Sequence, residues 1–425
     1  MARVLVVGSG GREHALAWKL NSSPNVDELV CAPGNSGMST IAECIDVVAS
    51  DPIAVADLAD KVNSDLVVIG PEDPVVAGVV DEVTRRGRLA FGPSAASARL
   101  EGSKAWMKQV LVAAGVPTAK HMSFDATQLD PALAYLETMQ DLWVIKTDGL
   151  AAGKGVIVTE SLDTARRAVS EYLSGTAFGS AGTTCVIEEG MVGPELSLFA
   201  MCDGTDAVFI GCAQDHKRIG DADTGPNTGG MGAYSPVPFV TQELIDEVME
   251  TAIRPTLVEL ERRGAPYRGV LFCGLMMTTT GPKVIEYNVR FGDPECQVLM
   301  RLLESDLFVH LHECASGAIR TPVLRSEHAS VGLWLTAEGY PTTPRVGDSI
   351  SGLEVANAIP GVEVFFGGAS RTPDGLKTSG GRSLCVTATG CDLQSAVDLS
   401  YAGAASISFR GMHYRRDIAA QGLIR

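Results

Sequence analysis

The sequence feature that most restricts the fold is a set of four short apolar runs in the first 100 residues, each followed by a loop containing glycine or proline. Segments with the pattern of helices separate these runs. Continuous apolar strands joined by helical crossovers predict a parallel sheet with helices on both faces. The predicted strands are 4–7, 29–31, 66–69 and 89–91, and the predicted helices are 13–20, 53–62 and 75–86.

The loops that follow these strands are residues 8–11, 33–37, 70–74 and 92–94. Because the carboxyl ends of parallel strands meet at one edge of a sheet, we expect the four loops to lie together, and open α/β sheets bind ligands at that edge. A single loop of this kind is more simply explained as a tight turn. Four of them at one edge favour a binding pocket.

The remaining sequence predicts further domains, because 425 residues exceed what one hydrophobic core usually holds. A helix at 103–113 leads into a second α/β region, and the chain becomes rich in strands and turns after about residue 329. The other expected elements are strands at 143–146, 156–159, 185–188, 197–202 and 207–212, helices at 161–173, 242–263 and 393–406, and a hairpin at 269–288.

An excess of acidic residues limits the possible partners. The chain has 51 acidic and 34 basic side chains, for a formal net charge of −17. Such a field repels phosphate backbones and anionic membranes, so we expect no nucleic-acid or membrane partner. The ten cysteines lack zinc-site spacing, and no apolar run reaches the roughly 20 residues that cross a bilayer. The N-terminus resembles a first strand rather than a signal peptide, which favours a cytoplasmic protein.

The first glycine cluster, at residues 8–13, resembles a dinucleotide-binding turn but lacks its full pattern. Glu13 stands where the pattern G-x-G-x-x-G requires a third glycine, and the second strand ends at Cys31 rather than at an acidic residue that would hold a ribose. NAD is therefore disfavoured. The turn still offers backbone N–H groups to a phosphate, and Arg12 would add positive charge.

A second glycine cluster lies between two predicted strands. Gly149, Gly153 and Gly155 would let the backbone approach a phosphate closely, and Lys146 and Lys154 bracket the loop with positive charge. The spacing does not match a Walker A loop. A plain glycine hairpin with solvated lysines explains the pattern equally well.

The third cluster, at 284–291, is the most specific. Strand alternation places Glu286, Asn288 and Arg290 on one face, and the apolar residues of this segment, Ile285 among them, on the other. A carboxylate and an amide oxygen two positions apart suit Mg²⁺, and an arginine fork suits a carboxylate or phosphate. The simpler alternative is a half-exposed strand with polar residues in solvent.

Two further segments have weaker patterns. Residues 214–234 form a glycine-rich polar stretch, which predicts a long functional loop or a disordered excursion. Near the C-terminus, Gly380, Gly381 and Arg382 are interpreted as a structural turn rather than as a part that closes the active site.

Four long motifs occur in the order typical of one family. Residues 8–18, 146–158, 214–218 with 225–236, and 290–295 closely resemble the glycinamide ribonucleotide synthetases, also called phosphoribosylamine–glycine ligases. The resemblance extends over essentially the whole chain. It implies an ATP-grasp ligase of de novo purine (IMP) biosynthesis that joins glycine to 5-phosphoribosylamine through glycyl phosphate, releasing ADP and phosphate.

The resemblance also implies an α/β architecture: an N-terminal open parallel sheet domain (1–102), an ATP-grasp domain (103–328) with a mobile lid at about 120–190, and a small C-terminal α+β domain (329–425). A monomer or weak dimer is expected. The alternatives are another ATP-grasp ligase or carboxylase acting on a phosphoribosyl substrate, and a non-catalytic nucleotide-binding sensor.

The resemblance assigns roles to individual residues. Catalysis would use Arg290, Asp215 and Lys146, and Mg²⁺ or Mn²⁺ would bind Glu286 and Asn288. The residues implied at ATP are Lys104, Lys146, Gly149, Gly153, Lys154, Gly155, Glu188, Glu189, Met191 and Glu195. Those implied at glycine or phosphoribosylamine are Gly10, Gly11, Arg12, Gly34, Asn35, Glu72, Asp215 and Arg290.

Overall fold

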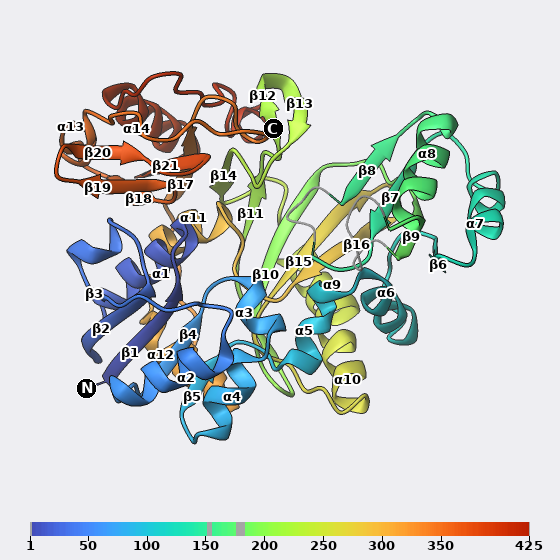
Figure 1. Cartoon of the computed structure of the whole chain (residues 1–425), viewed down its shortest axis with the longest axis horizontal. Coiled ribbons are helices and arrows are strands. Elements are labelled where there is room, and N and C mark those ends of the chain that lie inside the picture. Colours follow the sequence, from blue (N-terminus) through green and yellow to red (C-terminus); the bar gives the residue numbers. More distant parts are fainter. Residues whose placement is uncertain (1, 151–154, 176–182, 425) are drawn as a thin grey trace.

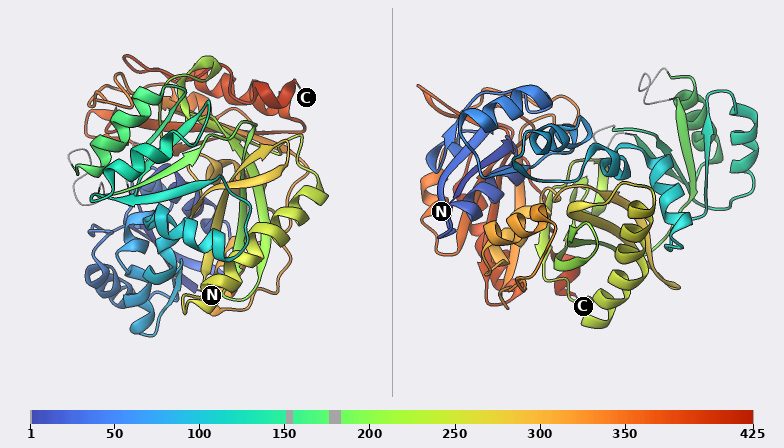
Figure 2. Two further views of the ribbon diagram at one scale, coloured as in Figure 1. Left: turned by 90° about the vertical axis from the view of Figure 1, so that its right-hand side faces the viewer. Right: turned by 90° about the horizontal axis from the view of Figure 1, so that it is seen from below.

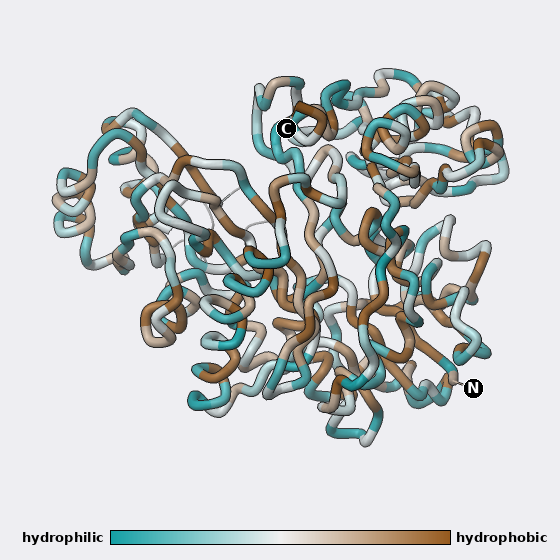
Figure 3. The backbone as a smooth tube through the Cα atoms, turned by 180° about the vertical axis from the view of Figure 1, so that it is seen from behind, coloured by the Kyte–Doolittle hydropathy of each residue, from teal (hydrophilic) through white to brown (hydrophobic). Residues whose placement is uncertain are grey.

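The computed structural model describes residues 2–150, 155–175 and 183–424 (Figure 1). The N-terminal sheet and the C-terminal part lie next to each other, and a smaller sheet projects from the opposite side of the molecule (Figures 1 and 2). Apolar segments are concentrated in the strands of the body, as the hydropathy colouring shows (Figure 3). In the described residues, no helix combines the length and apolar character needed to cross a membrane.

The N-terminal sheet is parallel and has the order β3-β2-β1-β4-β5. Val4 packs in the cluster that contains Leu16 of α1 (Gly11–Asn21), whereas its neighbour Leu5 packs with Val55 of α2 (Pro52–Lys61). Both faces are therefore covered, which confirms the predicted architecture. The strands are β1 (Ala2–Gly8), β2 (Val26–Pro33), β3 (Glu43–Cys44), β4 (Leu66–Ile69) and β5 (Leu89–Phe91).

The helices of this region confirm the segments expected at 13–20, 53–62 and 103–113 and correct a fourth. The single helix predicted at 75–86 is wrong, because Gly78 adopts φ +89° and divides it into α3 and α4. The helices are α1 (Gly11–Asn21), α2 (Pro52–Lys61), α3 (Glu72–Val76), α4 (Val79–Arg85), α5 (Ala95–Gly102) and α6 (Lys104–Ala113).

The projecting part, which we call the lid, is a four-stranded antiparallel sheet of order β6-β9-β7-β8. Ile145 of β7 and Ile187 of β9 pack with Val169 of α8 and Leu136 of α7. This core is separate from those of the body. The elements are β6 (His121–Asp125), α7 (Leu129–Leu136), β7 (Trp143–Thr147), β8 (Val156–Thr159), α8 (Leu162–Leu173) and β9 (Thr184–Glu189).

An eight-stranded sheet of order β16-β15-β10-β11-β14-β17-β21-β18 runs through the centre and into the C-terminal part. The stretch 214–234, expected to be a loop, instead contains the hairpin β12–β13 and the strand β14, which links β11 to β17. The strands are β10 (Glu195–Asp203), β11 (Ala207–Asp215), β12 (Arg218–Gly220), β13 (Thr224–Asn227), β14 (Gly232–Ser235), β15 (Arg268–Thr278), β16 (Gly281–Asn288), β17 (Ala329–Thr336), β18 (Val362–Phe366) and β21 (Arg382–Gly390).

The helices expected at 242–263 and 393–406 are present. The first contains a π-helical turn at Met249–Ile253. This turn ends two residues before Pro255, which has no N–H to donate to the preceding helical turn. The remaining elements are α9 (Gln242–Val248), α10 (Arg254–Arg262), α11 (Glu295–Leu302), α12 (Leu307–Ser316), α13 (Leu353–Asn357), β19 (Ala369–Thr372), β20 (Gly375–Thr378), α14 (Leu393–Ser406) and α15 (Ala420–Leu423).

Candidate active site

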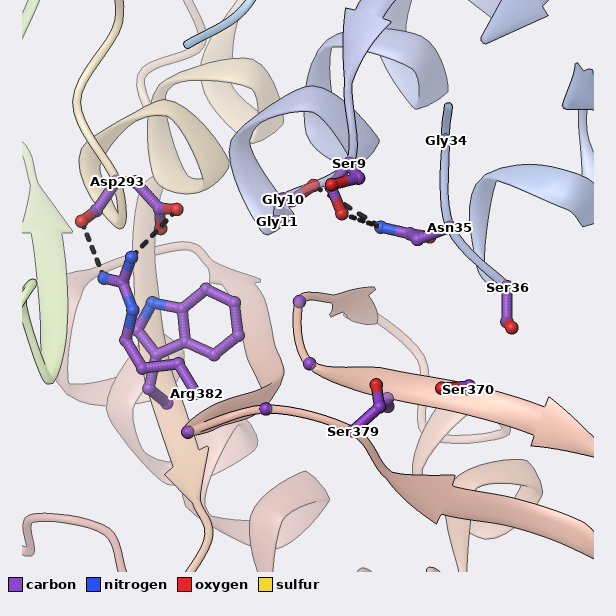
Figure 4. A pocket seen from close by; sticks show the side chains of 16 residues that line it. Ser9, Gly10, Gly11, Gly34, Asn35, Ser36, Asp293, Ser370, Ser379 and Arg382 are labelled. Atoms are coloured by element: carbon purple, nitrogen blue, oxygen red, sulfur yellow. Dashed lines mark hydrogen bonds and ion pairs between the residues drawn. The ribbon is translucent and has the colours of Figure 1, made fainter. Parts of the chain in front are cut away.

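A cavity of about 550 Å³ lies between the N-terminal sheet and the C-terminal part (Figure 4). Its walls come from the β1–α1 turn, the loop after β2 and two loops of the C-terminal part. Gly10, Gly11, Gly34 and Asn35, which the sequence motifs place at a substrate, all line it. The full lining is Ser9, Gly10, Gly11, Gly34, Asn35, Ser36, Asp293, Trp334, Gly367, Gly368, Ala369, Ser370, Ser379, Gly380, Gly381 and Arg382.

Asn35 holds the cavity walls together. Its side-chain amide donates hydrogen bonds to the carbonyl oxygens of Ser9 and Phe366, both at 2.9 Å, and its Oδ1 accepts from the N–H of Gly37 at 2.9 Å. Gly34 has φ +70°, and a Cβ at this position would lie 2.5 Å from Cys44 Sγ. The loop therefore requires glycine here, and Asn35 connects it to both neighbouring walls.

Arg12 is held by contacts with other protein groups. It is buried, its Nε donates to Glu13 at 2.6 Å, and its Nη1 donates to the carbonyl oxygen of Phe291 at 3.2 Å. Glu13 in turn accepts from the N–H of Gly10 at 2.7 Å, so it organises the start of α1. Arg12 does not line this cavity, and its expected role at a substrate stays a prediction.

Arg290 lies beside this turn, between two carboxylates. Its Nε contacts Glu72 at 3.0 Å, and its Nη2 contacts Glu101 at 2.8 Å. The second oxygen of Glu101 accepts from the N–H of Val289 at 2.8 Å. Glu72 and Arg290, both expected at a substrate, thus lie together. The Arg290 donors that were expected to bind a ligand contact the carboxylates of Glu72 and Glu101 in this structure. Glu101 belongs to no sequence motif, so sequence reasoning missed it.

The two carboxylates differ in protonation. Burial opposes ionisation of Glu72, but Arg290 and Arg12 outweigh burial and lower the pKa of Glu72 to about 2. Burial of Glu101 outweighs its pairing with Arg290 and raises the pKa of Glu101 to about 7. One carboxylate is therefore ionised at neutral pH and the other is close to its titration point.

Replacing Glu101 by glutamine is expected to reduce the dependence of stability on pH. The pKa of Glu101 is raised from 4.5 to about 7 in the folded protein, so its stabilising effect is complete below pH 4.5 and is lost as the pH rises through about 7. Between about pH 5 and about pH 8, the melting temperature of the wild type should fall further than that of the variant. The surface variant Glu28→Gln is the control, and equal slopes for wild type and Glu101→Gln would contradict the assignment.

Two buried lysines, one from the lid and one from α6, share one carboxylate of the lid. Lys146 of β7 contacts Glu188 at 2.9 Å and donates to the carbonyl oxygen of Ile285 at 3.2 Å, while Lys108 of α6 contacts Glu188 at 3.0 Å. Burial lowers the pKa of Lys108 to about 8. The Glu188 side chain is only 2% exposed. Both lysines hold this side chain inside the protein. Lys108 was not among the expected residues.

The loop after β7 begins beside Lys104. The Lys104 ammonium donates to the carbonyl oxygen of Gly149 at 3.1 Å, which ties the start of α6 to this loop. Gly155 is buried, and its carbonyl oxygen accepts from the N–H of Thr147 at 2.9 Å. The predicted phosphate contacts Gly153 and Lys154 lie outside the described residues.

The hinge after β9 contains the other residues expected near a nucleotide. Glu189 accepts from the N–H of Lys120 at 3.0 Å and so braces β6 against β9. Met191 is partly exposed, and Glu195 is exposed and pairs with Lys217 at 2.6 Å. Lys217 was missed, although it lies in one of the recognised motifs.

The strand β16 contains a bulge that sequence alternation did not predict. Gly274 of β15 pairs with Glu286, whereas Leu275 pairs with Val284, so Ile285 is the extra residue. Ile285 is therefore only partly buried, and its expected place on the apolar face is wrong. Glu286 and Asn288 follow the bulge and are both partly exposed, as is typical of residues that face a site.

The charges of four cations act on the Glu286 carboxylate. Burial opposes its ionisation, but Lys217, Lys146, Lys104 and Arg290 outweigh burial and lower the pKa of Glu286. Among the described residues, Glu286 forms no ion pair within 4.0 Å. The same residues contain no cluster of three or more acidic, histidine or cysteine side chains able to hold a metal. An ionised carboxylate followed by an amide oxygen fits a hard divalent cation that takes its other ligands elsewhere.

Asp215 lies across the site, next to the turn at Gly229 and Gly230. It accepts from the N–H of His216 at 2.6 Å, and a Cβ on Gly230 would lie 2.9 Å from its Oδ1. Burial and the nearby carboxylate of Glu295 raise the pKa of Asp215 well above its usual value. Burial also raises the pKa of Glu295, so these two carboxylates favour holding a proton or a cationic group.

The chain is an ATP-grasp ligase: its lid sheet carries a buried lysine, its central sheet has an acidic strand end, and an ATP-grasp domain model matches this part of the chain. Family models for the N domain, the ATP-grasp (A) domain and the C domain of phosphoribosylglycinamide synthetase match residues 2–101, 102–296 and 330–421. The chain belongs to the phosphoribosylglycinamide synthetase family.

Individual relatives are similar to this chain along their full lengths. The chain is 46% identical to a phosphoribosylamine–glycine ligase of Mesorhizobium japonicum, with 99% of both chains covered. It is 47% identical to the ligase of Phenylobacterium zucineum, covering 99% of this chain and 100% of that protein. The crystal structure of the Thermotoga maritima ligase superposes with a TM-score of 0.86 at 32% identity, covering 98% of this chain and 100% of that one.

Proposed function

We propose that this chain joins glycine to 5-phosphoribosylamine at the expense of ATP, the step of purine biosynthesis that forms glycinamide ribonucleotide. The observation that carries the proposal is the match of the N, ATP-grasp and C domain models of phosphoribosylglycinamide synthetase along the chain. Within the matched ATP-grasp part, the charges of Lys104, Lys146, Lys217 and Arg290 all favour the ionised form of Glu286. In a chain of net charge −17, such a local concentration of cations marks a site for a phosphorylated ligand.

The nucleotide would lie between the lid and the central sheet. Lys104 and Lys146 would neutralise phosphate charge, and the loop from Gly149 to Gly155 would close over the phosphates. The hinge backbone from Glu188 to Met191 would line the adenine, and Glu195 would meet the ribose. Glu286 and Asn288 would hold Mg²⁺ or Mn²⁺, which when bound would neutralise charge on the phosphates.

The two remaining substrates would meet at the cavity edge. Asp215 favours a cationic partner, so it suits the ammonium of glycine, and Arg290 suits the carboxylate if that group displaces Glu72. The cavity lined by Gly10, Gly11 and Asn35 would take phosphoribosylamine.

Amide formation needs an activated carboxyl group, because oxide is too poor a leaving group. An oxygen of the glycine carboxylate attacks the γ-phosphorus of ATP, the bond to the bridging oxygen breaks, and ADP leaves. The amine of phosphoribosylamine then attacks the carbonyl carbon of glycyl phosphate. Phosphate leaves, and the nitrogen loses a proton. The protein contributes position and charge neutralisation, and the lid excludes water from the acyl phosphate.

The test is phosphate release with each substrate omitted in turn. Release should require ATP, glycine, phosphoribosylamine and a divalent cation together, and glycinamide ribonucleotide should accumulate in equal amount. Release that depends on bicarbonate instead of glycine would indicate a carboxylase. Nucleotide binding without any turnover would indicate a sensor.

Replacing Gly11 by alanine is expected to weaken phosphoribosylamine binding selectively. The new Cβ would lie 2.6 Å from Trp334 Cη2 and 2.9 Å from Gln297 Nε2, so the indole that lines the cavity must shift. The KM for phosphoribosylamine should rise about tenfold while the KM for ATP stays within about twofold. Gly102→Ala is the matched control, because its Cβ would make an ordinary contact with Val76 at 3.5 Å. An unchanged KM for phosphoribosylamine would place that substrate elsewhere.

A further inference from the structure

Arg382 is the residue through which the C-terminal part reaches the loops of the candidate active site. It begins β21 and lies along the indole of Trp334, 4.9 Å from the ring centroid (Figure 4). Its Nη2 contacts the Asp293 carboxylate at 3.0 Å. Its Nη1 donates to the carbonyl oxygens of Asp293 at 2.9 Å and Gly230 at 3.2 Å, and also to that of Gly229.

The first of these partners is the turn behind Asp215. Gly230 packs so closely on the Asp215 carboxylate that a Cβ on it would lie 2.9 Å from Oδ1. Arg382 binds this turn by two consecutive carbonyl oxygens, so the turn cannot move away from the arginine without breaking both hydrogen bonds. The position of Asp215 therefore depends on a residue more than 160 positions later in the chain.

The second partner is the loop that follows Arg290. The Arg382 guanidinium binds both the carboxylate and the backbone carbonyl oxygen of Asp293. The other carboxylate oxygen of Asp293 accepts a hydrogen bond from Gln297 at 2.8 Å. Only Phe291 and Gly292 separate Asp293 from Arg290. Arg382 thus fixes, at one point, the two loops that carry the residues proposed to hold glycine.

The chemistry of the contact requires a guanidinium group. One planar cation serves three carbonyl oxygens and one carboxylate while it stacks on an indole, and an ammonium on a lysine stem cannot satisfy all of these geometries. The side chains of Arg382 and Asp293 are 20% and 16% exposed, so water screens this ion pair only partly. The described contacts of Arg382 do not include Lys104, Lys146 or Glu188 of the nucleotide region.

We infer that Arg382 is a positioning residue for the ligation, and that through it the C-terminal part sets the affinity for the two substrates other than ATP. This inference rests on the proposed function. It also gives a role to the segment 380–382, which the sequence alone indicated to be a structural turn.

The test is the kinetics of Arg382→Ala in the full-length chain. The value of kcat/KM should fall at least about tenfold for glycine and for phosphoribosylamine, while the KM for ATP stays within about twofold. Added guanidinium ion at low concentration should restore part of the lost activity, and methylammonium should not. Arg382→Lys should resemble the alanine variant. Arg410→Ala, an exposed arginine of the same part of the chain, should match the wild type.

Three results would overturn the inference: wild-type constants in Arg382→Ala, full activity in Arg382→Lys, or equal losses for all three substrates without rescue by guanidinium. The last result, with a lowered melting temperature, would mean that Arg382 only stabilises the fold. Failure of the proposed function is distinguishable from these, because the wild-type chain itself would then show no phosphate release that depends on glycine.

Discussion

Replacing Glu286 by alanine is expected to abolish ligation while the protein remains folded. Burial opposes ionisation of this carboxylate, but the charges of Lys104, Lys146, Lys217 and Arg290 outweigh burial and lower its pKa. Without it, the proposed cation loses its charged ligand and the phosphates lose their alignment. Loss of several kcal/mol of transition-state stabilisation corresponds to a fall in kcat of at least about 10³-fold.

The measurement is glycinamide ribonucleotide formation over a wide range of Mg²⁺ and Mn²⁺ concentrations. Folding is checked by the melting temperature, and Glu261→Ala is the control because that glutamate is exposed on α10. Near-normal turnover of Glu286→Ala at saturating metal would refute the assignment of Glu286 as a ligand.

Replacing Glu188 by glutamine is expected to destabilise the lid strongly. The substitution removes the carboxylate that lies 2.9 Å from Lys146 and 3.0 Å from Lys108 and leaves two buried ammonium groups facing each other. Breaking a buried pair of this kind typically costs about 3–5 kcal/mol. Because the chain has several domains, the suitable measurement is hydrogen exchange of the amides in β7 and β9, with β1 as the internal reference.

The double variant Lys108→Met with Glu188→Gln is the matched control. It removes one of the two opposed ammonium groups, so the lid should regain part of its protection, and the two substitutions should be strongly non-additive. Additive effects, or a loss below about 1 kcal/mol in Glu188→Gln alone, would show that Glu188 does not neutralise the lysines.

Much of the N-terminal fold could be predicted because its signals are local. The apolar runs around Val4 and Leu66 are strands of a parallel sheet, and the glycine loops lie at the carboxyl edge, where Gly10, Gly34 and Asn35 line one cavity. Each signal depends only on neighbouring residues and on the general geometry of parallel strands.

Other parts of the site had no local signal. Glu101 and Lys108 are single charged residues in ordinary helices, and their role follows from partners far away in sequence. The bulge at Ile285 depends on how β16 pairs with β15, and alternation along one strand contains no information on that pairing.

Taken alone, the amino-acid sequence determined the class of fold, the family and the residue types that the chemistry requires, because periodicity and motif spacing are properties of short segments. Tertiary structure alone decided which charges neutralise one another and that Arg382 joins the loops of Asp215 and Arg290. The physical reason is that burial and distance set the strength of an ion pair, and both depend on how segments hundreds of residues apart pack together.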